Sequence, residues 1–430
     1  MTATVGPLGG DRRSRKRNTV RKPVLTLAVL SHTVVDASVN ILPVVLPLIA
    51  DRFHLSYGQV GLVAALMNVS SSVIQPVLGW MADRWRTAWL IPVGIAWTGV
   101  FMGCVGLASN YGMLLGIVLL AGLGSAAFHP IASIAVAQAS GIRRGFGMSL
   151  FSTGGNVGFA VGPVLAAWLL RWGDLPAMLV LIVPGCLMAA AYAVSRPAIA
   201  GGIRGGEPAG ASSHPVPWRR LSLLCALITF RSWGYAGLIV FIPLWLHAQG
   251  GSAEEAGQAL FVFLFAGAVG GLVGGILSDR VGRQPVVALS LVVFPGLMAM
   301  ALLMPGPLRW GALAGAGMVL MASFSVTVVY AQELLPRHPG LASGLALGLA
   351  FGTGGLGVAL SGFLADLIGL TRSIWTLVFL PGLAGLLAFC LAAPTDHSEY
   401  AVVKELLDRR NSGKGIRSRN ETIENGQVIS

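Results

Sequence analysis

The sequence has few charged residues and few cysteines. Charged side chains make up 11% of the 430 residues, hydrophobic ones make up 55%, and the mean hydropathy is +0.76. A soluble globular chain carries roughly 25% charge. The four cysteines fall in apolar segments without paired spacing, which favours neither a disulfide framework nor a metal site. This composition excludes a soluble globular protein and predicts a membrane protein.

Motifs for enzymatic chemistry are missing as well. The sequence contains no Gly-x-x-x-x-Gly-Lys phosphate loop and no His-Glu-x-x-His metal motif, and no expected loop is large enough for a catalytic domain. "GLGSAA", from Gly122 to Ala127, imitates a dinucleotide fingerprint, but it lies in an apolar helix with no strand before it. We therefore expect neither an enzyme nor an ATP-driven pump, and we expect no cofactor and no metal ion.

Long apolar runs dominate the chain. Each is long enough for a helix that crosses about 30 Å of hydrocarbon. The first set of expected helices covers residues 23–50, 57–80, 89–109, 112–139, 145–170 and 175–195. The second set covers residues 220–247, 255–277, 285–305, 309–333, 340–366 and 372–393. The fold class predicted is therefore an all-α membrane protein with twelve transmembrane helices.

Positive charge is distributed unevenly over the connecting segments. Of the 29 Lys and Arg residues, Arg231 lies inside an expected helix, and most others fall in the two tails and in alternate loops. The opposite loops contain only Arg52, Arg171, Arg309 and Arg372. The positive-inside rule then predicts that both termini are cytoplasmic. The net charge of +12 is explained mainly by this topology, so we expect no nucleic-acid partner.

The chain contains an internal repeat. Motifs recur at an offset of 196 residues, at Pro47 and Pro243, Gly61 and Gly257, and Asp83 and Asp279. This indicates two pseudo-symmetric six-helix bundles, a plan found in many secondary transporters. The expected segments are a basic N-terminal tail (1–22), a first bundle (23–195), a cytoplasmic linker (196–219), a second bundle (220–393) and a cytoplasmic C-terminal tail (394–430).

One acid, Asp36, lies deep in an expected helix, and His32 lies one helical turn before it. A bare charge at the bilayer centre costs on the order of 3 kcal/mol, so it persists only where a cavity or a partner receives it. Two interpretations are open: a proton-exchanging carboxylate with a titratable imidazole neighbour, or a polar pair that fixes helix packing. His129, in "FHP", is a further candidate for proton coupling, although a lone histidine is more often a core residue.

Arg231 is the cationic counterpart in the second half. A shift of 196 places it opposite Val35, beside Asp36, so both charges should lie at a similar depth. Three interpretations are open: a salt bridge with Asp36 that forms in one state and breaks in another, a grip on an anionic group of the substrate, or a permanent structural pair.

The remaining candidates form two sets. Neutral polar or aromatic side chains could contact substrate, although each alone more often serves packing: Asn68, Gln75, Phe128, Asn156, Trp233 and Tyr235. A second set lies at the expected cytoplasmic helix ends and could form a gate: Gly79, Asp83, Arg84, Gly275, Asp279, Arg280 and Arg283. The alternative for the second set is positive-inside charge with helix capping.

Several motifs resemble those of the major facilitator superfamily. "GWMADRWR" and "GILSDRVGRQ" resemble its loop signature Gly-x-x-x-Asp-Arg-x-Gly-Arg, the second more completely than the first. "SHTVVD", "GLGSAAFHP" and "VVYAQELLPRHPGLASGLALGLAFGTGGLGVALSG" are similar to drug exporters of the fosmidomycin-resistance type within it. "GNVGFAVGP", from Gly155 to Pro163, resembles the superfamily's antiporter signature. Two positions depart from the pattern, because Ile131 and Val118 stand where an acid and an arginine are usual.

The resemblance implies a monomeric transporter of the bacterial cytoplasmic membrane. Its partners would be protons, the lipid bilayer and a small compound or drug, exported by proton antiport with alternating access. A cavity with one arginine suits phosphonate-like or other anionic compounds, although aromatic neighbours would also admit neutral drugs. A same-fold alternative is an importer or proton symporter of a small organic anion, since transporters of one fold run in both directions.

Overall fold

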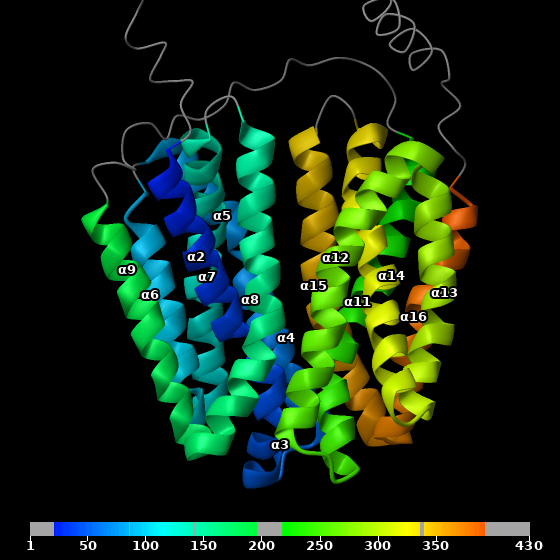
Figure 1. Cartoon of the computed structure of the whole chain (residues 1–430), viewed down its shortest axis with the longest axis horizontal. Helices are drawn as coiled ribbons and strands as arrows, with labels where there is room; N and C mark the ends of the chain where they lie inside the picture. The colour runs from blue at the N-terminus through cyan, green and yellow to red at the C-terminus, as the bar shows by residue number, and fades with distance from the viewer. Residues whose placement is uncertain (1–20, 86, 141–142, 196–216, 336–338, 392–430) are drawn as a thin grey trace, which may run out of the picture. The chain divides into compact units, whose positions relative to one another are not determined.

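The structure, a computed structural model, describes residues 21–85, 87–140, 143–195, 217–335 and 339–391. Within these residues, twelve helical spans are long and apolar enough to cross a membrane (Figure 1). The predicted twelve-helix architecture is therefore confirmed. Nearly all of the tails and the linker expected at 1–22, 196–219 and 394–430 lies outside the described residues.

The helices fall into two sets that follow one another along the chain. The first set consists of α2 (Lys22–Val39), α3 (Leu42–Phe53), α4 (Tyr57–Val73), α5 (Gln75–Arg84), α6 (Leu90–Gly103), α7 (Tyr111–Ala139), α8 (Arg144–Gly173) and α9 (Ile182–Val194), with 3-10 turns at Cys104–Leu107 and Leu175–Leu181. The second set consists of α11 (Trp218–Ala248), α12 (Ala253–Val281), α13 (Arg283–Leu303), α14 (Pro307–Leu334), α15 (Pro339–Ile368) and α16 (Leu370–Phe389).

Two spans that were expected to be continuous helices are broken. The first span divides between α2 and α3, and the second between α4 and α5. A proline follows each break, Pro43 in the first turn of α3 and Pro76 in the first turn of α5. Proline lacks a backbone N–H and disfavours a helical residue before it, so the helix ends and restarts there. At the first break the Asn40 amide donates to the carbonyl of Phe159 over 2.5 Å.

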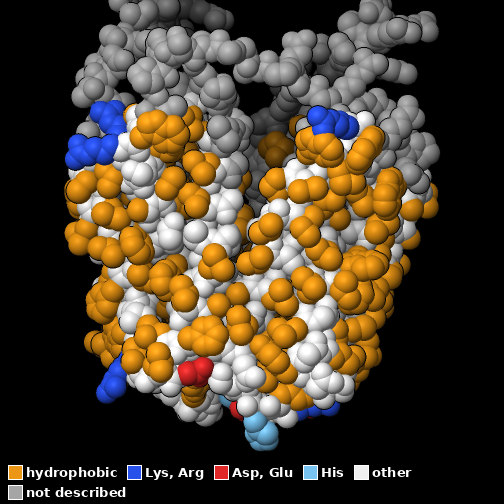
Figure 2. All heavy atoms as spheres, turned by 180° about the vertical axis from the view of Figure 1, so that it is seen from behind, with side chains coloured by type: hydrophobic (Ala, Val, Ile, Leu, Met, Phe, Trp, Pro, Cys, Tyr) orange, Lys and Arg blue, Asp and Glu red, His pale blue; other side chains and the backbone are white. Residues whose placement is uncertain are grey.

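Each set forms a bundle, and the two bundles meet along a seam (Figure 1). We call the end where α2 begins the α2 end, and the end where α3 finishes at Phe53 the α3 end. Across the seam, α4 packs along α15, α8 packs along α12, and α3 reaches α11. Figure 2 shows an apolar surface over the middle of both bundles, with the charged side chains at the two ends, as a protein crossing a bilayer requires.

The seam is closed at the α3 end and open at the α2 end. Gly348, Gly352, Gly355 and Gly362 lie on one face of α15, because their spacing follows the helical repeat. A Cβ atom added to Gly362 would lie 2.3 Å from the carbonyl oxygen of Tyr57, and one on Gly355 would lie 2.8 Å from the Cβ of Asn68. An added Cβ on Gly348 or Gly352 would meet nothing within 4 Å. The bundles therefore diverge toward the α2 end.

Polar contacts between the bundles reinforce the closed end. Both carboxylate oxygens of Asp366, on α15, accept backbone N–H groups of Tyr57 and Gly58 over 2.8 Å each, at the first turn of α4. This places a negative charge at a helix N-terminus, where it is favourable. Asp51 and His247, which are 196 residues apart, lie 2.7 Å from one another beside a cavity of about 550 Å³.

The close approach of α4 and α15 predicts a position-dependent effect of added volume. Gly362→Val would overpack backbone atoms and should destabilise the folded protein by about 1–3 kcal/mol. Gly348→Val, on the same face of the same helix, has open space and should be close to neutral. Thermal unfolding of the purified variants checks this. Equal melting temperatures for the two variants would contradict the closed seam.

Candidate functional site

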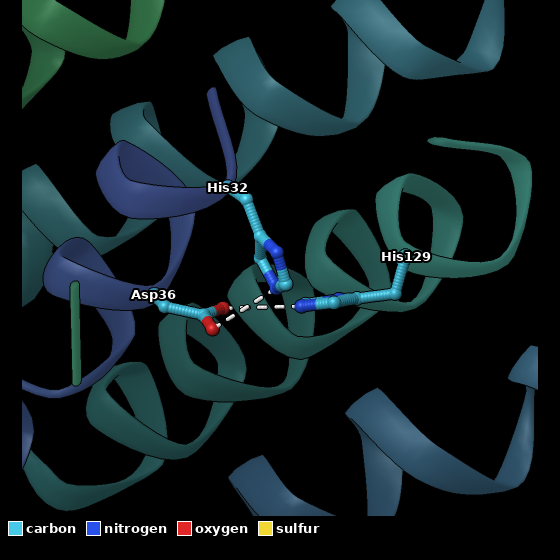
Figure 3. Close-up of side chains that lie close together, drawn as sticks. All are labelled: His32, Asp36 and His129. Atoms are coloured by element: carbon cyan, nitrogen blue, oxygen red, sulfur yellow. Dashed lines mark hydrogen bonds and ion pairs between the residues drawn. The ribbon is translucent and has the colours of Figure 1, made fainter. Parts of the chain in front are cut away.

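A compact polar cluster lies within the first bundle. It consists of His32 and Asp36 from α2 and His129 from α7 (Figure 3). The Nε2 atom of His32 lies 3.2 Å from Oδ2 of Asp36, and Nε2 of His129 lies 3.1 Å from Oδ1. One ring nitrogen of each histidine and one carboxylate oxygen of Asp36 all lie within 4.8 Å of one another. The two hydrogen-bonding contacts account for this spacing, and Asp36 is only 4% exposed.

The close packing of α2 against α8 positions the cluster. Glycines of α8 contact the backbone of α2, as at Gly158, where an added Cβ would lie 2.4 Å from the carbonyl oxygen of Thr33. At Gly155 an added Cβ would lie 2.6 Å from the His32 ring and 2.8 Å from Oδ2 of Asp36. Gly155 therefore leaves the space that the imidazole and the carboxylate occupy.

Backbone carbonyls and aromatic rings orient both imidazoles. The Nδ1 atom of His32 lies 2.8 Å from the carbonyl oxygen of Phe151, whose ring stacks on the imidazole at 4.0 Å. The Nδ1 atom of His129 lies 2.8 Å from the carbonyl oxygen of Ser125. Each Nε2 is thereby turned toward Asp36. The hydrogen bond that one ring nitrogen makes determines the protonation and the orientation of the other nitrogen.

The Phe128 side chain is enclosed by other side chains in this structure. It is fully buried, with its ring 5.8 Å from that of His32. The predicted substrate contact at Phe128 is therefore absent from this conformation, because the ring is enclosed by the core around the histidines.

Arg231 lies within the second bundle and is 3% exposed. Its guanidinium donates to the hydroxyl of Thr327 over 3.2 Å and to the hydroxyl of Ser232 over 3.1 Å, and it lies 4.8 Å from the centre of the Phe324 ring. No carboxylate of the described residues lies within ion-pair distance of it. A buried cation held only by hydroxyls and a ring is electrostatically unbalanced.

The salt bridge between Asp36 and Arg231, one of the three interpretations that the sequence leaves open, is absent from this structure. Both residues lie near the middle of their spans, Lys22–Phe53 and Trp218–Ala248, as the repeat predicted. Asp36 is instead engaged by two histidines of its own bundle, and Arg231 is turned toward α14. The two charges are therefore held separately, one in each bundle.

The other predicted substrate contacts differ in their surroundings. The Trp233 indole donates to the hydroxyl of Ser361 over 2.8 Å and so ties α11 to α15. Tyr235 packs its ring beside Phe263. The Asn68 amide donates to the carbonyl of Ala64 within α4, and the Gln75 amide, at the start of α5, donates to the carbonyl of Ser71 in α4. Asn156 is exposed, and its side chain bonds to no described residue.

The predicted gate residues make no ion pair across the seam among the described residues. Arg283 pairs with Asp279 and lies 3.1 Å from Glu333, all within the second bundle. Arg84 lies over the Trp80 ring at 4.0 Å, and Arg280 pairs with no described acid. Gly79 and Gly275 each have neighbours only in their own bundle. The Asp83 side chain lies outside the described residues.

Four polar residues that join helices were not anticipated as functional candidates. They are Asp51, His247, Glu333 and Asp366. The repeat provides a sequence signal for Asp51 and His247, because they occupy equivalent positions at the offset of 196. The pairing of Glu333 with Arg283 and of Asp366 with α4 depends on packing, which no sequence spacing reveals.

Comparison with known proteins agrees with this architecture. The family model of the Major Facilitator Superfamily matches residues 28–355 and 224–418. The Fosmidomycin resistance protein of Escherichia coli (strain K12) is 32% identical over 405 residues, covering 90% of this chain and 98% of that protein. The Uncharacterized MFS-type transporter YfnC of Bacillus subtilis (strain 168) is 35% identical over 400 residues, covering 89% and 95%.

A solved structure shares the fold. A bacterial homolog of the human lysosomal transporter Spinster, in an inward-facing and occupied conformation, superposes with a TM-score of 0.72 at 18% identity, covering 86% of this chain and 97% of that one. The family and the fold are those of transporters, which are not enzymes. The twelve spans, the duplicated bundles and the family match lead to one conclusion: this chain is a multi-pass membrane protein and belongs to the Major Facilitator Superfamily.

Proposed function

We propose that this protein is a secondary active exporter of small anionic compounds and that it exchanges them for protons. One observation carries the proposal: a buried carboxylate lies between two histidines in one bundle, and an unbalanced buried guanidinium lies at a similar depth in the other. Buried ionisable groups in membrane spans typically mark ion or substrate pathways. Two bundles that rock about such groups provide alternating access.

We further propose that the α2 end faces the cytoplasm of a bacterial cell and that the protein is a monomer of the inner membrane. The distribution of Lys and Arg supports this orientation. The conformation described here is then open to the cytoplasm and closed to the outside by Asp366, Asp51 and His247. The gate around Asp83 and Asp279 would act in the opposite conformation.

In the proposed cycle, the first bundle binds the protons and the second bundle binds the substrate. Protons enter from outside and load the cluster of His32, Asp36 and His129, and the bundles rock to the inward-open conformation. The anionic group of a cytoplasmic substrate then binds the fork of donors on Arg231, which suits planar or tetrahedral oxyanions. Proton release to the cytoplasm accompanies the return. Each proton moves inward with about 2.3 kcal/mol per 100 mV of membrane potential.

Fosmidomycin, which carries a phosphonate group, is the probe we propose, because a similar protein is a fosmidomycin resistance protein. The chain would be expressed in a strain that lacks its own fosmidomycin resistance. We expect a rise of roughly tenfold or more in the inhibitory concentration, and uptake into everted vesicles that follows an imposed pH gradient after ATP depletion. Unchanged susceptibility and no vesicle uptake would contradict export of this drug class.

The alternative is an importer or proton symporter of a small organic anion. Arg231 supports it equally, because an anion clamp serves either direction. Vesicles of known orientation distinguish the two by counterflow. In an antiporter, the anion enters the vesicle while protons leave it. In a symporter, the anion and the protons cross the membrane in the same direction.

Gly155 gives a test of the coupling cluster that leaves every ionisable group in place. Gly155→Ala would press a methyl group into the His32 ring and Asp36, so we expect proton-driven vesicle uptake to fall by roughly tenfold or more. Gly116→Ala on α7 is the matched control, because nothing lies within 4 Å of its added Cβ. Equal uptake by the two variants would show that the cluster geometry is irrelevant to transport.

A further inference from the structure

The hydrogen bonds of the two imidazoles fix which nitrogen can exchange a proton. The Nδ1 atoms of His32 and His129 each lie 2.8 Å from a backbone carbonyl oxygen. A carbonyl oxygen only accepts, so each Nδ1 must carry a hydrogen to form its bond. The Ser125 hydroxyl, 3.3 Å from Nδ1 of His129, lies farther away than the carbonyl. In both rings the exchangeable position is therefore Nε2.

Both Nε2 atoms face the same carboxylate, and each faces a different oxygen of it (Figure 3). An ionised carboxylate only accepts, and an unprotonated Nε2 also only accepts. A nitrogen and an oxygen at 3.1–3.2 Å are therefore bonded only when a hydrogen lies between them. Two such contacts need two hydrogens, and one proton would leave the other contact repulsive.

Few other groups could supply these hydrogens. Among the helices that pack against α2, the α6 stretch Leu90–Gly103 contains no ionisable residue. The ionisable residues of α8 are Arg144 and Arg171, near its two ends, and those of α9 are Cys186 and Tyr192. On α7, apart from His129, only Tyr111 is ionisable, and its hydroxyl donates to the carbonyl of Gln59. On the α8 side, the residue beside His32 and Asp36 is Gly155, which has no side chain and so supplies no proton.

We propose that the cluster of His32, Asp36 and His129 binds two exchangeable protons, one on each Nε2, and that the geometry described here is its doubly loaded state. This two-proton site depends on the proposed function only in that the protons are used to drive transport. Loaded, two imidazolium ions and one carboxylate leave a net charge of +1. Emptied, the same atoms carry a charge of −1 and two repulsive contacts.

The proton load then controls the distance between two helices. His129 belongs to α7, whereas His32 and Asp36 belong to α2, so loss of the proton on His129 removes the hydrogen bond between His129 and Asp36 that joins α7 to α2. The exchange route is through His129. Its side chain is 24% exposed, compared with 10% for His32 and 5% for Asp36.

The test uses the full chain in lipid nanodiscs without substrate. Nitrogen-15 NMR of labelled histidine distinguishes imidazolium from the neutral ring, and His32→Gln and His129→Gln assign the two signals among seven histidines. Near pH 6 we expect both rings to be imidazolium in the wild type. Asp36→Asn should convert both to the neutral form, whereas His54→Asn, at an exposed position with a positive φ that Asn tolerates, should leave both unchanged.

Each outcome decides the proposal. Two imidazolium signals that are lost together in Asp36→Asn support it. A single signal, or two that survive in Asp36→Asn, overturns the two-proton site. If a histidine variant fails to fold, the infrared band of the Asp36 carboxylate gives a second measure, since the loaded state requires the ionised carboxylate and a protonated one contradicts it. Absence of drug export would refute the proposed function and leave these signals unchanged.

Discussion

Asp36→Asn should abolish uphill transport while leaving downhill exchange in place. The carboxylate accepts from two imidazoles, and each hydrogen bond between charged groups contributes about 1.5–3 kcal/mol. An asparagine has no charge to stabilise either imidazolium, and its NH₂ group can donate to a neutral Nε2 instead. The loss of two such bonds weakens proton binding by roughly a hundredfold or more. We expect proton-driven uptake of fosmidomycin into everted vesicles to fall by a similar factor.

The control and the contrary outcome are both accessible. Asp174→Asn removes an exposed carboxylate between α8 and the 3-10 turn at Leu175–Leu181 and keeps the size of the side chain, so it should transport as the wild type does. Counterflow of fosmidomycin without a pH gradient separates a coupling defect from a folding defect, because it needs substrate binding and rocking but no proton. If Asp36→Asn still accumulates drug against a gradient and moves protons with it, the coupling assignment is wrong.

A lower pH inside the everted vesicles should accelerate uptake until the cluster is fully loaded. In such vesicles the former outer face of the protein is enclosed, so protons load from the lumen. A rise in luminal pH lowers the concentration of protons that can load the cluster and also lowers the gradient that drives them outward from the vesicle. Uptake should therefore decline as luminal pH is raised at a fixed outer pH, and this decline should be absent in Asp36→Asn.

The sequence reveals the architecture more fully than the site. Twelve apolar runs and a repeat of 196 residues are visible in one dimension, and they led directly to the two bundles. The breaks after Val39 and Val73 also have local causes, Pro43 and Pro76. His32 and Asp36 were paired correctly because positions four apart share a helix face.

Long-range partners were less accessible. His129 lies 93 residues from Asp36, and their contact requires the particular packing of α2, α7 and α8. For Arg231 the repeat predicted the depth but not the direction of a long, flexible side chain. Its contacts with Thr327 and Ser232 follow from the packing of α11 and α14. The pairing with Asp36, one of the interpretations that the sequence leaves open, is absent from this conformation for the same reason.

Replacement of Arg231 should have opposite effects on binding and on stability. The guanidinium is the buried cation with no carboxylate partner among the described residues, and it presents a fork of donors suited to an oxyanion. Arg231→Met removes the charge and keeps an apolar stem. We expect fosmidomycin affinity to fall by roughly a hundredfold, because a desolvated phosphonate would then lack a countercharge. Arg231→Lys keeps the charge but loses the fork of donors, so its affinity for fosmidomycin should fall by roughly tenfold.

Thermal unfolding distinguishes this anion site from a structural arginine. A buried charge without a partner destabilises the substrate-free protein, so Arg231→Met should unfold at a higher temperature than the wild type. It should also gain no further stability from added fosmidomycin, whereas the wild type should gain stability because ligand binds only the folded state. If the guanidinium instead serves as an anchor for Thr327, Ser232 and Phe324, Arg231→Met will unfold at a lower temperature and Arg231→Lys will not rescue it. A higher unfolding temperature in Arg231→Met would therefore show that Arg231 is a charge that awaits a substrate anion. A lower one would show that Arg231 stabilises the packing of the second bundle.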